Sequence, residues 1–277
     1  MENNVNSSEL KRIELGIFKE YIKICEKFNL TYFIAGGTAL GAVRHGGFIP
    51  WDDDIDVVMP RPDYDKFLQY AQKELPNELF LQTNDSDKDY VGIYAKLRNS
   101  NTTFIETSVK NLSINHGVFI DIFPIDGYPS DYKKAKKIKQ KSNLVKKALN
   151  SYYYPSSFRK RLTSIISKII LGKFTKKSII TYFDNYAKKI KYEESLLTTC
   201  HGGVWGDKEI VKKEYYGQGK LIKFENLFVN GPEKIEDYLK SKYGDYMQLP
   251  PIEKRVSHHY CETIDLQNSY KKYVDSK

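Results

Sequence analysis

Residues 36–58 read Gly36-Gly37-Thr38-Ala39-Leu40-Gly41-Ala42-Val43-Arg44-His45-Gly46-Gly47-Phe48-Ile49-Pro50-Trp51-Asp52-Asp53-Asp54-Ile55-Asp56-Val57-Val58, and this stretch decides the fold. A predicted strand over 32–35 leads into it and ends at the paired glycines. A short helical pattern, a Gly/Pro turn and a second strand with acidic residues follow in that order. We therefore expect part of a β-sheet here, with a short helix between its two strands.

The acidic residues of the second strand predict a metal site. Side chains two apart on a strand point to the same side, so Asp54 and Asp56 can present carboxylates to one ion. Hard oxygen ligands suit Mg²⁺, with Mn²⁺ as an alternative, and such an ion leaves positions for phosphate oxygens. A solvated turn is the other interpretation, but it does not explain why apolar Ile55, Val57 and Val58 are interleaved with the acids.

The glycines upstream predict a phosphate site next to these acids. Gly36 and Gly37 have no Cβ, so backbone N–H groups at the start of the following helix, up to Thr38, can come close to a phosphate. A phosphate cradle followed by a carboxylate pair is typical of metal-assisted phosphoryl or nucleotidyl transfer. This chemistry is the first functional hypothesis for the chain.

A third acidic residue, Asp121, stands alone in the apolar run 118–124. Burying an unpaired carboxylate is costly, so this side chain needs a partner. It can be a structural residue that caps a neighbouring turn. It can also be a third metal ligand that accepts the proton of an attacking hydroxyl. The pair at Asp54 and Asp56 favours the second interpretation.

The remaining patterns predict one sheet with helices packed on it, hence an α/β or α+β core. Apolar residues recur at helical spacing over 8–28 and 63–74. Short strand-like runs are separated by spacers rich in Asn, Asp and Ser, which favours hairpins. These runs cover 79–82, 90–97, 102–106 and 117–123.

The net charge of +9 on 277 residues is unevenly distributed. Residues 131–191 hold 18 Lys and Arg against two Asp, a local charge of +16, so the rest of the chain carries −7. Such a segment suggests contact with anionic lipid head groups or a lipid-linked pyrophosphate. No helix-turn-helix, zinc-finger or RNP pattern supports nucleic acid as the partner.

Two apolar stripes occur inside this basic segment. The first consists of Leu162, Ile165, Ile166, Ile169 and Ile170, and the second of Ile179, Phe183, Tyr186 and Ile190. For each helix taken alone, the favoured interpretation is a stripe that faces a core while the lysines are solvated.

Composition predicts a soluble, cytoplasmic protein. The three dispersed cysteines form no CxxC pair, which fits a reducing compartment. The first eight residues lack the apolar region of a signal peptide, and no window approaches 18 uninterrupted apolar residues. His258 and His259 are interpreted as surface residues rather than ligands.

The long motif over 36–56 resembles the signature of the LicD family. These are bacterial phosphocholine transferases that decorate cell-surface glycans and are akin to the fukutin-related ribitol-phosphate transferases. The resemblance covers most of 30–128 and 220–260, and 131–199 has no match. It continues in Phe119-Ile120-Asp121-Ile122-Phe123-Pro124-Ile125-Asp126-Gly127, in Tyr238-Leu239, in Tyr243-Gly244-Asp245-Tyr246-Met247-Gln248-Leu249-Pro250-Pro251, and in Arg255 and His258.

The resemblance implies an α+β fold with a nucleotidyltransferase-like core, in which a mixed sheet is packed with helices. It implies that Asp54 and Asp56 are the carboxylate pair that holds Mg²⁺ and that Asp121 is the third carboxylate. A CDP-linked alcohol would then give its phospho-alcohol to a sugar hydroxyl and release CMP.

Four basic residues are candidates for contact with the donor phosphates. Arg44 and His45 lie on the loop before the acids, and Lys96 and Arg98 share one face of a strand. For Lys96 and Arg98, plain surface charge is an equally good interpretation.

These inferences predict a catalytic core over 1–130, a basic helical insertion over 131–199, and a part over 200–277 that completes the core. The expected function is transfer of phosphocholine from CDP-choline to a lipid-linked or oligosaccharide glycan precursor, such as one for teichoic acid or capsule. We expect it at the inner face of an anionic membrane, without nucleic acid. The alternatives are ribitol- or glycerol-phosphate transfer, nucleotidyl transfer to a sugar or antibiotic hydroxyl, and a non-catalytic protein that binds anionic surfaces.

Overall fold

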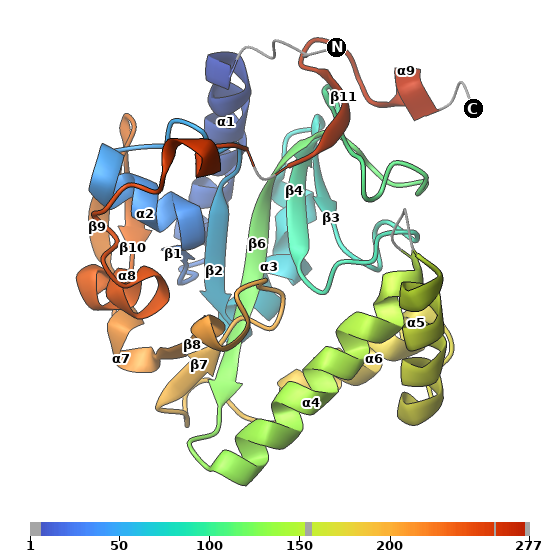
Figure 1. The fold of residues 1–277 in the computed structure, drawn as a ribbon. Coiled ribbons are helices and arrows are strands. Elements are labelled where there is room, and N and C mark those ends of the chain that lie inside the picture. The colour runs from blue at the N-terminus through green and yellow to red at the C-terminus, as the bar shows by residue number, and fades with distance from the viewer. Residues whose placement is uncertain (1–6, 153–156, 258, 275–277) are drawn as a thin grey trace.

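A mixed β-sheet forms the centre of the computed structural model, which describes residues 7–152, 157–257 and 259–274 (Figure 1). Strands β2 and β6 are parallel, and the other neighbours in the sheet pair antiparallel. The order across the sheet is β1 (Phe33–Ile34), β2 (Asp56–Pro60), β6 (Val118–Tyr128), β4 (Ala95–Asn99) and β3 (Leu79–Gln82). The far end of β6 continues into β7 (Leu197–Thr199) and β8 (Ile210–Lys212).

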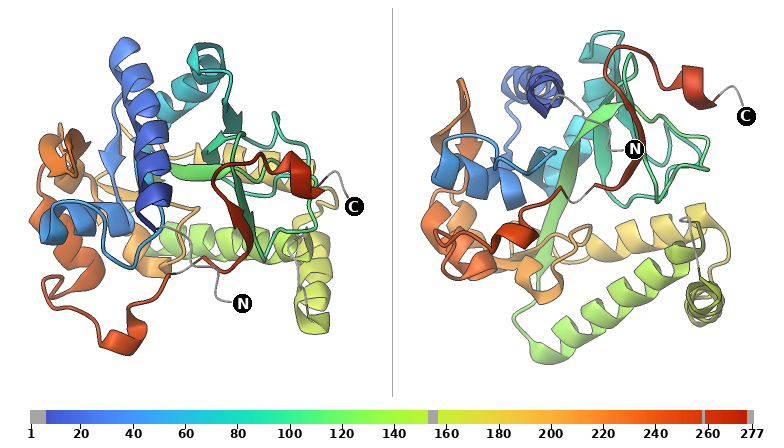
Figure 2. Two further views of the ribbon diagram at one scale, coloured as in Figure 1. Left: turned by 90° about the horizontal axis from the view of Figure 1, so that it is seen from above. Right: turned by 45° about the horizontal axis from the view of Figure 1, so that its top comes forward.

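Helices α1 (Ser7–Lys27) and α3 (Arg61–Glu74) pack on the sheet and against each other (Figure 2). Alternation along the strands explains this packing, because every second side chain faces the helices. Val57 of β2 and Ile122 of β6 are fully buried, as is Phe18 of α1. Burial of a side chain of this size stabilises the fold by about 1.5–3 kcal/mol, so this layer is the main core.

A second group of elements lies beside β1 and β2. It includes α2 (Gly36–His45), which ends at Gly46 in the left-handed conformation with φ of 72°. The hairpin of β9 (Lys220–Phe224) and β10 (Leu227–Gly231) contacts both α2 and β1. The remaining elements of this group are α7 (Lys213–Tyr216), α8 (Ile235–Tyr243) and the short 3₁₀ helix η2 (Gly206–Glu209).

Among the described residues, three α-helices stand between β6 and β7 in the sequence, namely α4 (Tyr132–Leu149), α5 (Phe158–Leu171) and α6 (Lys176–Ala187). A buried ion pair joins them to the core. The guanidinium of Arg61 donates to both carboxylate oxygens of Asp126, at 2.6 and 2.8 Å, and to Asp184 of α6 at 2.9 Å. The limits of the insertion at 131 and 199 remain a prediction.

The prediction of hairpins among the middle strands is wrong for the run 102–106. This run forms β5 (Thr103–Glu106), which pairs with β11 (Cys261–Asp265) from the far end of the chain. Spacer composition indicates turns, but it cannot reveal a partner more than 150 residues away. The strand expected over 90–97 begins only at Ala95. The short elements not yet named are η1 (Asn150–Tyr152), η3 (Ile252–Lys254) and α9 (Lys271–Val274).

Of the two apolar stripes in the insertion, one is buried and the other is exposed. In α6 the prediction of a core-facing stripe is confirmed for Ile179 and Phe183, which are buried. In α5 it is wrong, because the stripe points outward and Ile165 and Ile169 are 55% and 62% exposed. Within the described ranges, no helix is both long enough and apolar enough to cross a membrane.

Candidate active site

A cavity of about 1040 Å³ opens on the side of the sheet away from the core-facing side chains. It is lined by Asp56 and Val58 of β2 and by Asp121 and Phe123 of β6. These residues alternate with the buried apolar ones, so the strand period assigns them to the cavity. Further walls come from α2, from the loop before β8, from α8 and from the segment that follows it.

The cavity brings together the three carboxylates singled out from the sequence. Asp54 lies just before β2, Asp56 is the first residue of β2, and Asp121 lies in β6. Asp56 and Asp121 are direct partners in the parallel pairing of β2 with β6. Two acids 65 positions apart thus lie side by side on one face, which spacing alone could not establish.

Burial raises the pKa of all three carboxyls. For Asp54 and Asp56 the removal of water is the larger cause of the raised pKa, and neighbouring carboxylates add to it. The pKa of Asp121 is raised by burial and held back by Lys96, whose Nζ lies 3.0 Å from Oδ1. Concentrated negative charge of this kind costs stability unless cations join it.

A second acidic group overlaps with the first. Asp52, Asp53 and Asp54 each offer a carboxylate oxygen, and these oxygens lie within 4.8 Å of one another, an arrangement that can hold a metal ion. Asp53, however, already accepts from His259 Nδ1 at 3.1 Å and from the hydroxyl of Ser257. Asp52 and Asp54 line the cavity.

This donor set fits a hard divalent cation. The candidate ligands are all carboxylate oxygens, which Mg²⁺ and Mn²⁺ prefer, and they line a cavity wide enough to admit phosphate oxygens as well. Their raised pKa values indicate excess negative charge that a divalent ion would neutralise.

The N-terminus of α2 faces the cavity through Gly36 and Gly37. The N-cap residue of this helix makes no side-chain hydrogen bond. The N–H of Gly36 donates to the Tyr238 hydroxyl at 3.2 Å, so the N–H groups that follow it are the ones that can meet an anion. Gly36 has φ of +52°, and a Cβ there would lie 2.8 Å from Oδ2 of Asp56. Thr38 does not line the cavity, but its hydroxyl accepts the Asp56 N–H at 2.8 Å and so fixes the start of β2.

Of the four basic candidates, only Arg44 lines the cavity. Its guanidinium donates to the Tyr246 carbonyl at 3.2 Å and lies 5.9 Å from the centre of the Trp51 ring. The Nε of Arg44 donates to the ring of His45 at 3.0 Å. The ring of His45 lies edge to face with Trp51, with ring centres 6.1 Å apart, and His45 is not among the residues that line the cavity.

Lys96 and Arg98 are both buried, so the interpretation as surface charge is wrong for them. Lys96 forms an ion pair with Asp121 and is therefore the counter-charge of a carboxylate that lines the cavity. Arg98 donates to Gln82, at 2.6 Å, and to the Gly117 carbonyl, also at 2.6 Å. Neither residue is among the described residues that line the cavity.

Sequence reasoning missed an ion pair in the opposite wall. Lys242 of α8 donates to Glu209 at 2.7 Å, both side chains are 8% exposed, and both line the cavity. Burial lowers the pKa of Lys242, but Tyr238 and then Glu209 outweigh this effect and raise it. Lys242 directly precedes the family-like motif that begins at Tyr243, and this position is the sequence signal that could have identified it.

His259 was also missed, because it was interpreted as a surface residue. It lines the cavity, and its side chain is 17% exposed. Burial opposes a charge on the ring, but the hydrogen bond to Asp53 and the nearby carboxylates outweigh it and raise the pKa to about 9. His258 lies outside the described residues.

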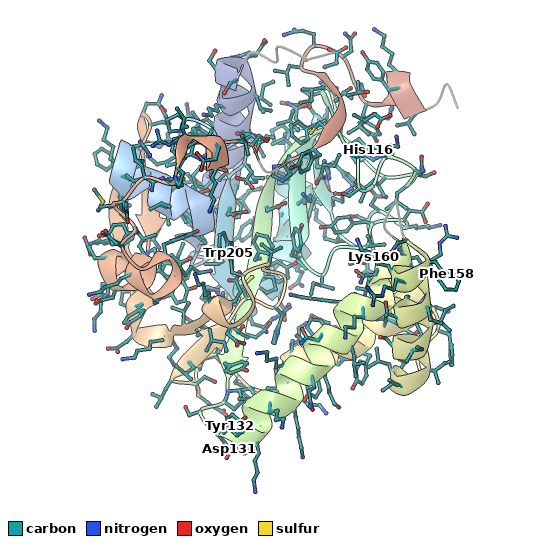
Figure 3. All side chains as sticks on the ribbon, viewed as in Figure 1. His116, Asp131, Tyr132, Phe158, Lys160 and Trp205 are labelled. Carbon is teal, nitrogen blue, oxygen red and sulfur yellow. The ribbon has the colours of Figure 1, made fainter. Side chains whose placement is uncertain are left out.

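Aromatic rings form much of the cavity wall. Tyr94 and Phe123 pack with ring centres 4.2 Å apart, and Trp205 meets Tyr243 edge to face at 5.7 Å. Figure 3 labels Trp205 beside the central strands, well away from α5. Tyr152 lies in the insertion and is not among the residues that line the cavity, and Tyr153 and Tyr154 lie outside the described residues.

The profile of the LicD/FKTN/FKRP nucleotidyltransferase domain matches residues 29–167. Lipopolysaccharide cholinephosphotransferase LicD of Haemophilus influenzae is 30% identical over 266 residues, which cover 93% of this chain and 97% of that protein. The chain belongs to the LicD family. The α+β class predicted from the sequence is confirmed, and the chain is a transferase.

A shorter match extends to the eukaryotic branch of this family. Ribitol 5-phosphate transferase FKRP of Homo sapiens is 44% identical over 36 residues, which cover 13% of this chain and 7% of that protein. The family profile ends at residue 167, beyond the predicted start of the insertion at 131. It therefore includes α4 and part of α5 of this LicD-family chain.

Proposed function

We propose that this chain transfers phosphocholine from CDP-choline to a hydroxyl of a cell-surface glycan precursor and releases CMP. One observation carries the proposal, namely that Asp54, Asp56 and Asp121 line a single cavity at the N-terminus of α2. The relationship to a lipopolysaccharide cholinephosphotransferase supports phosphocholine as the group transferred.

The donor's pyrophosphate would lie between the N-terminus of α2 and the acidic residues. Helix N-termini favour anions, and the absence of a Cβ at Gly36 and Gly37 permits close approach of the backbone. Arg44 and Lys242 add positive charge from two other walls. Holding both reactants in place is the main source of rate in phosphoryl transfer.

Asp54, Asp56 and Asp121 would hold Mg²⁺, or Mn²⁺ in its place. The ion would neutralise pyrophosphate charge and stabilise the leaving CMP. Lys96, 3.0 Å from Asp121, keeps that carboxylate in place behind the cavity and limits the rise of its pKa.

In the reaction itself, the acceptor's hydroxyl oxygen attacks the phosphorus that bears choline. The bond from this phosphorus to the bridging oxygen breaks, and its electron pair leaves with CMP. Asp121 is the candidate to accept the hydroxyl proton, because it lies in the cavity wall beside Asp56.

Aromatic side chains favour choline over a polyol as the transferred group. A quaternary ammonium binds to ring faces by cation–π attraction, typically worth about 0.5–2 kcal/mol per ring. The Tyr94–Phe123 and Trp205–Tyr243 pairs supply such faces within the cavity. Ribitol or glycerol phosphate is the closest alternative, since the carboxylates do not distinguish the alcohol.

We place the reaction in the cytoplasm, at the inner face of a membrane where a lipid-linked acceptor would be presented. All three cysteines, Cys25, Cys200 and Cys261, are free thiols, which supports a reducing compartment. The basic helices α4–α6 would contact the acceptor or the membrane surface.

The test is CMP release by the purified chain with Mg²⁺ and with CDP-choline, CDP-ribitol or CDP-glycerol, in the presence and absence of a lipid-linked glycan acceptor. We expect acceptor-dependent CMP from CDP-choline. Release of CMP from CDP-ribitol but not from CDP-choline would show that ribitol phosphate is the transferred group. A product that keeps the cytosine base would instead identify a nucleotidyltransferase.

A further inference from the structure

Helix α5 is packed the reverse way to an ordinary amphipathic helix. Its small polar residues Ser164 and Ser167 are buried, and Ser164 donates to the Ala148 carbonyl of α4 at 2.7 Å. Its large apolar residues point outward and form what we call the α5 apolar face. This face consists of Phe158, Leu162, Ile165, Ile166, Ile169 and Ile170, each between 46% and 83% exposed.

The position of α5 makes this face accessible. Figures 1 and 2 show α5 at the outer edge of the molecule, crossing the end of α4. Figure 3 labels Phe158 and Lys160 at this edge. Apolar residues exposed singly are normal on a protein surface. A contiguous exposed apolar patch along one helix face instead marks an interaction site.

Charge identifies the partner. Residues 157–183 contain seven Lys and Arg and no Asp or Glu. Three of them, Arg159, Lys160 and Arg161, occupy the first turn of α5, where positive charge opposes the helix dipole and does not stabilise the helix. A second copy of this face would bring like charges together, so a pair of α5 helices is disfavoured.

Helix length fixes the mode of contact. The 14 residues of α5 extend about 21 Å, less than the roughly 30 Å of a bilayer's hydrocarbon core. A basic helix with one apolar face that is too short to span a bilayer lies in the plane of the interface.

We propose that the α5 apolar face docks on the surface of an anionic lipid bilayer, with its isoleucines among the acyl chains and its cations among the head groups. This inference does not use the cavity carboxylates, so it stands or fails separately from the proposed transferase reaction. It narrows the membrane contact proposed above from the three helices α4–α6 to one face of α5.

The experiment is co-sedimentation of the full chain with vesicles at about 0.15 M salt. We expect binding to vesicles of equal parts phosphatidylglycerol and phosphatidylcholine, and little binding to pure phosphatidylcholine. The double variant Ile165→Ser/Ile169→Ser should bind more than ~10-fold more weakly. The triple variant Arg159→Gln/Lys160→Gln/Arg161→Gln should lose roughly 10²-fold, since each cation near the surface adds about 1 kcal/mol.

A matched control is Leu221→Ser/Phe228→Ser in the β9–β10 hairpin, where both side chains are more than 70% exposed. This variant should bind vesicles like the wild type. A Phe158→Trp variant keeps the face apolar, and its added fluorescence should shift to shorter wavelength on the anionic vesicles.

Three results would overturn the proposal. One is absence of wild-type binding to the anionic vesicles, and another is equal binding by the Ile165→Ser/Ile169→Ser variant. The third is a dimer in sedimentation velocity that this variant abolishes, because the occupant of the face would then be a second copy of the chain.

Discussion

The cavity and the α5 apolar face both reverse the usual distribution of side chains. In the cavity, three carboxyls are crowded together, with Asp54 and Asp56 half-buried and Asp121 buried. On α5, isoleucines are exposed while serines are buried. Each reversal has a free-energy cost in the isolated chain that a suitable partner would remove. The two sites differ in the partner that their chemistry fits, a divalent cation with phosphates in one case and anionic lipid in the other.

Residues with a functional role differ from structural ones in this reversal. Neighbouring α6 follows the ordinary rule, since it buries Ile179 and Phe183 against α4. In the main core, Val57, Ile122 and Phe18 follow it too. We infer function only where the usual distribution of apolar and polar side chains is reversed. The predictions below test whether each reversal has the expected effect on turnover or on stability.

The largest expected effect is on turnover in Asp56→Asn. Loss of this charge should lower CMP release by at least about 10²–10³-fold, the range seen when one preorganised electrostatic group is removed. The same change should raise the unfolding temperature in the presence of a chelator, because the pKa of Asp56 is raised by burial and by Asp121. Thermal unfolding and the CMP assay measure the two effects together.

Asp207→Asn is the control for this experiment. Asp207 is 66% exposed and pairs with Lys139 at the surface, so its loss should leave both turnover and unfolding temperature nearly unchanged. Activity of Asp56→Asn within a few-fold of wild type would remove Asp56 from the catalytic site.

The next effect compares two phenylalanines of the insertion. Phe183→Ala in α6 should cost about 3–5 kcal/mol in the free energy of unfolding, because the side chain is 4% exposed and its removal leaves a cavity. Phe158→Ala in α5 should change that free energy by less than about 0.5 kcal/mol, since the side chain is 83% exposed. Urea unfolding measures both, and equal costs would mean that α5 packs as α6 does.

The smallest effect concerns His201, which lies where the insertion meets the core. Its Nδ1 is 3.0 Å from Ser142 Oγ of α4, and its ring packs edge to face on Phe183. Burial lowers its pKa to about 4, whereas the unfolded chain has the ordinary value near 6.5. The unfolded state thus binds more protons below pH 6.5, and stability falls as pH falls, by about 2 kcal/mol between pH 7 and 5.

His201→Asn removes this titration and should flatten the pH dependence of stability over that window. The comparison with wild type isolates His201, because Asp54 and Asp56 have raised pKa values and shift stability in the opposite direction in both proteins. If the two proteins differ in the free energy of unfolding by the same amount at pH 7 and at pH 5, the titration of His201 does not contribute to the stability of this interface.

Local sequence was sufficient for the elements and for much of the site. Period-two alternation assigned Asp54 and Asp56 to one side, and helical spacing predicted α1 and α3 closely. The long motif over 36–56 sufficed for the family because its glycines, turn and acids must all be present to build one site. The pairing of Asp56 with Asp121 required the structure, since register is set by the assembled sheet.

Long-range contacts explain what sequence reasoning missed. His259 looked like a surface residue, but the pairing of β11 with β5 brings it to the cavity. Glu209 and Lys242 find each other only after α8 packs beside η2. In α5, periodicity identified the apolar stripe correctly. It could not predict which side of the helix is buried, and in the structure that side carries Ser164 and Ser167.

The most direct test of the account is Mn²⁺ binding to the purified chain, followed by electron paramagnetic resonance in the presence of CDP-choline. The structure offers two overlapping carboxylate groups, and Asp56 belongs only to the one that spans β2 and β6, whereas Asp53 belongs only to the other. The account predicts that Asp56→Asn weakens Mn²⁺ binding at least ~10-fold and that Asp53→Asn binds nearly as wild type. Loss of binding in Asp53→Asn with full binding in Asp56→Asn would contradict it and would move the metal to the Asp52–Asp54 loop.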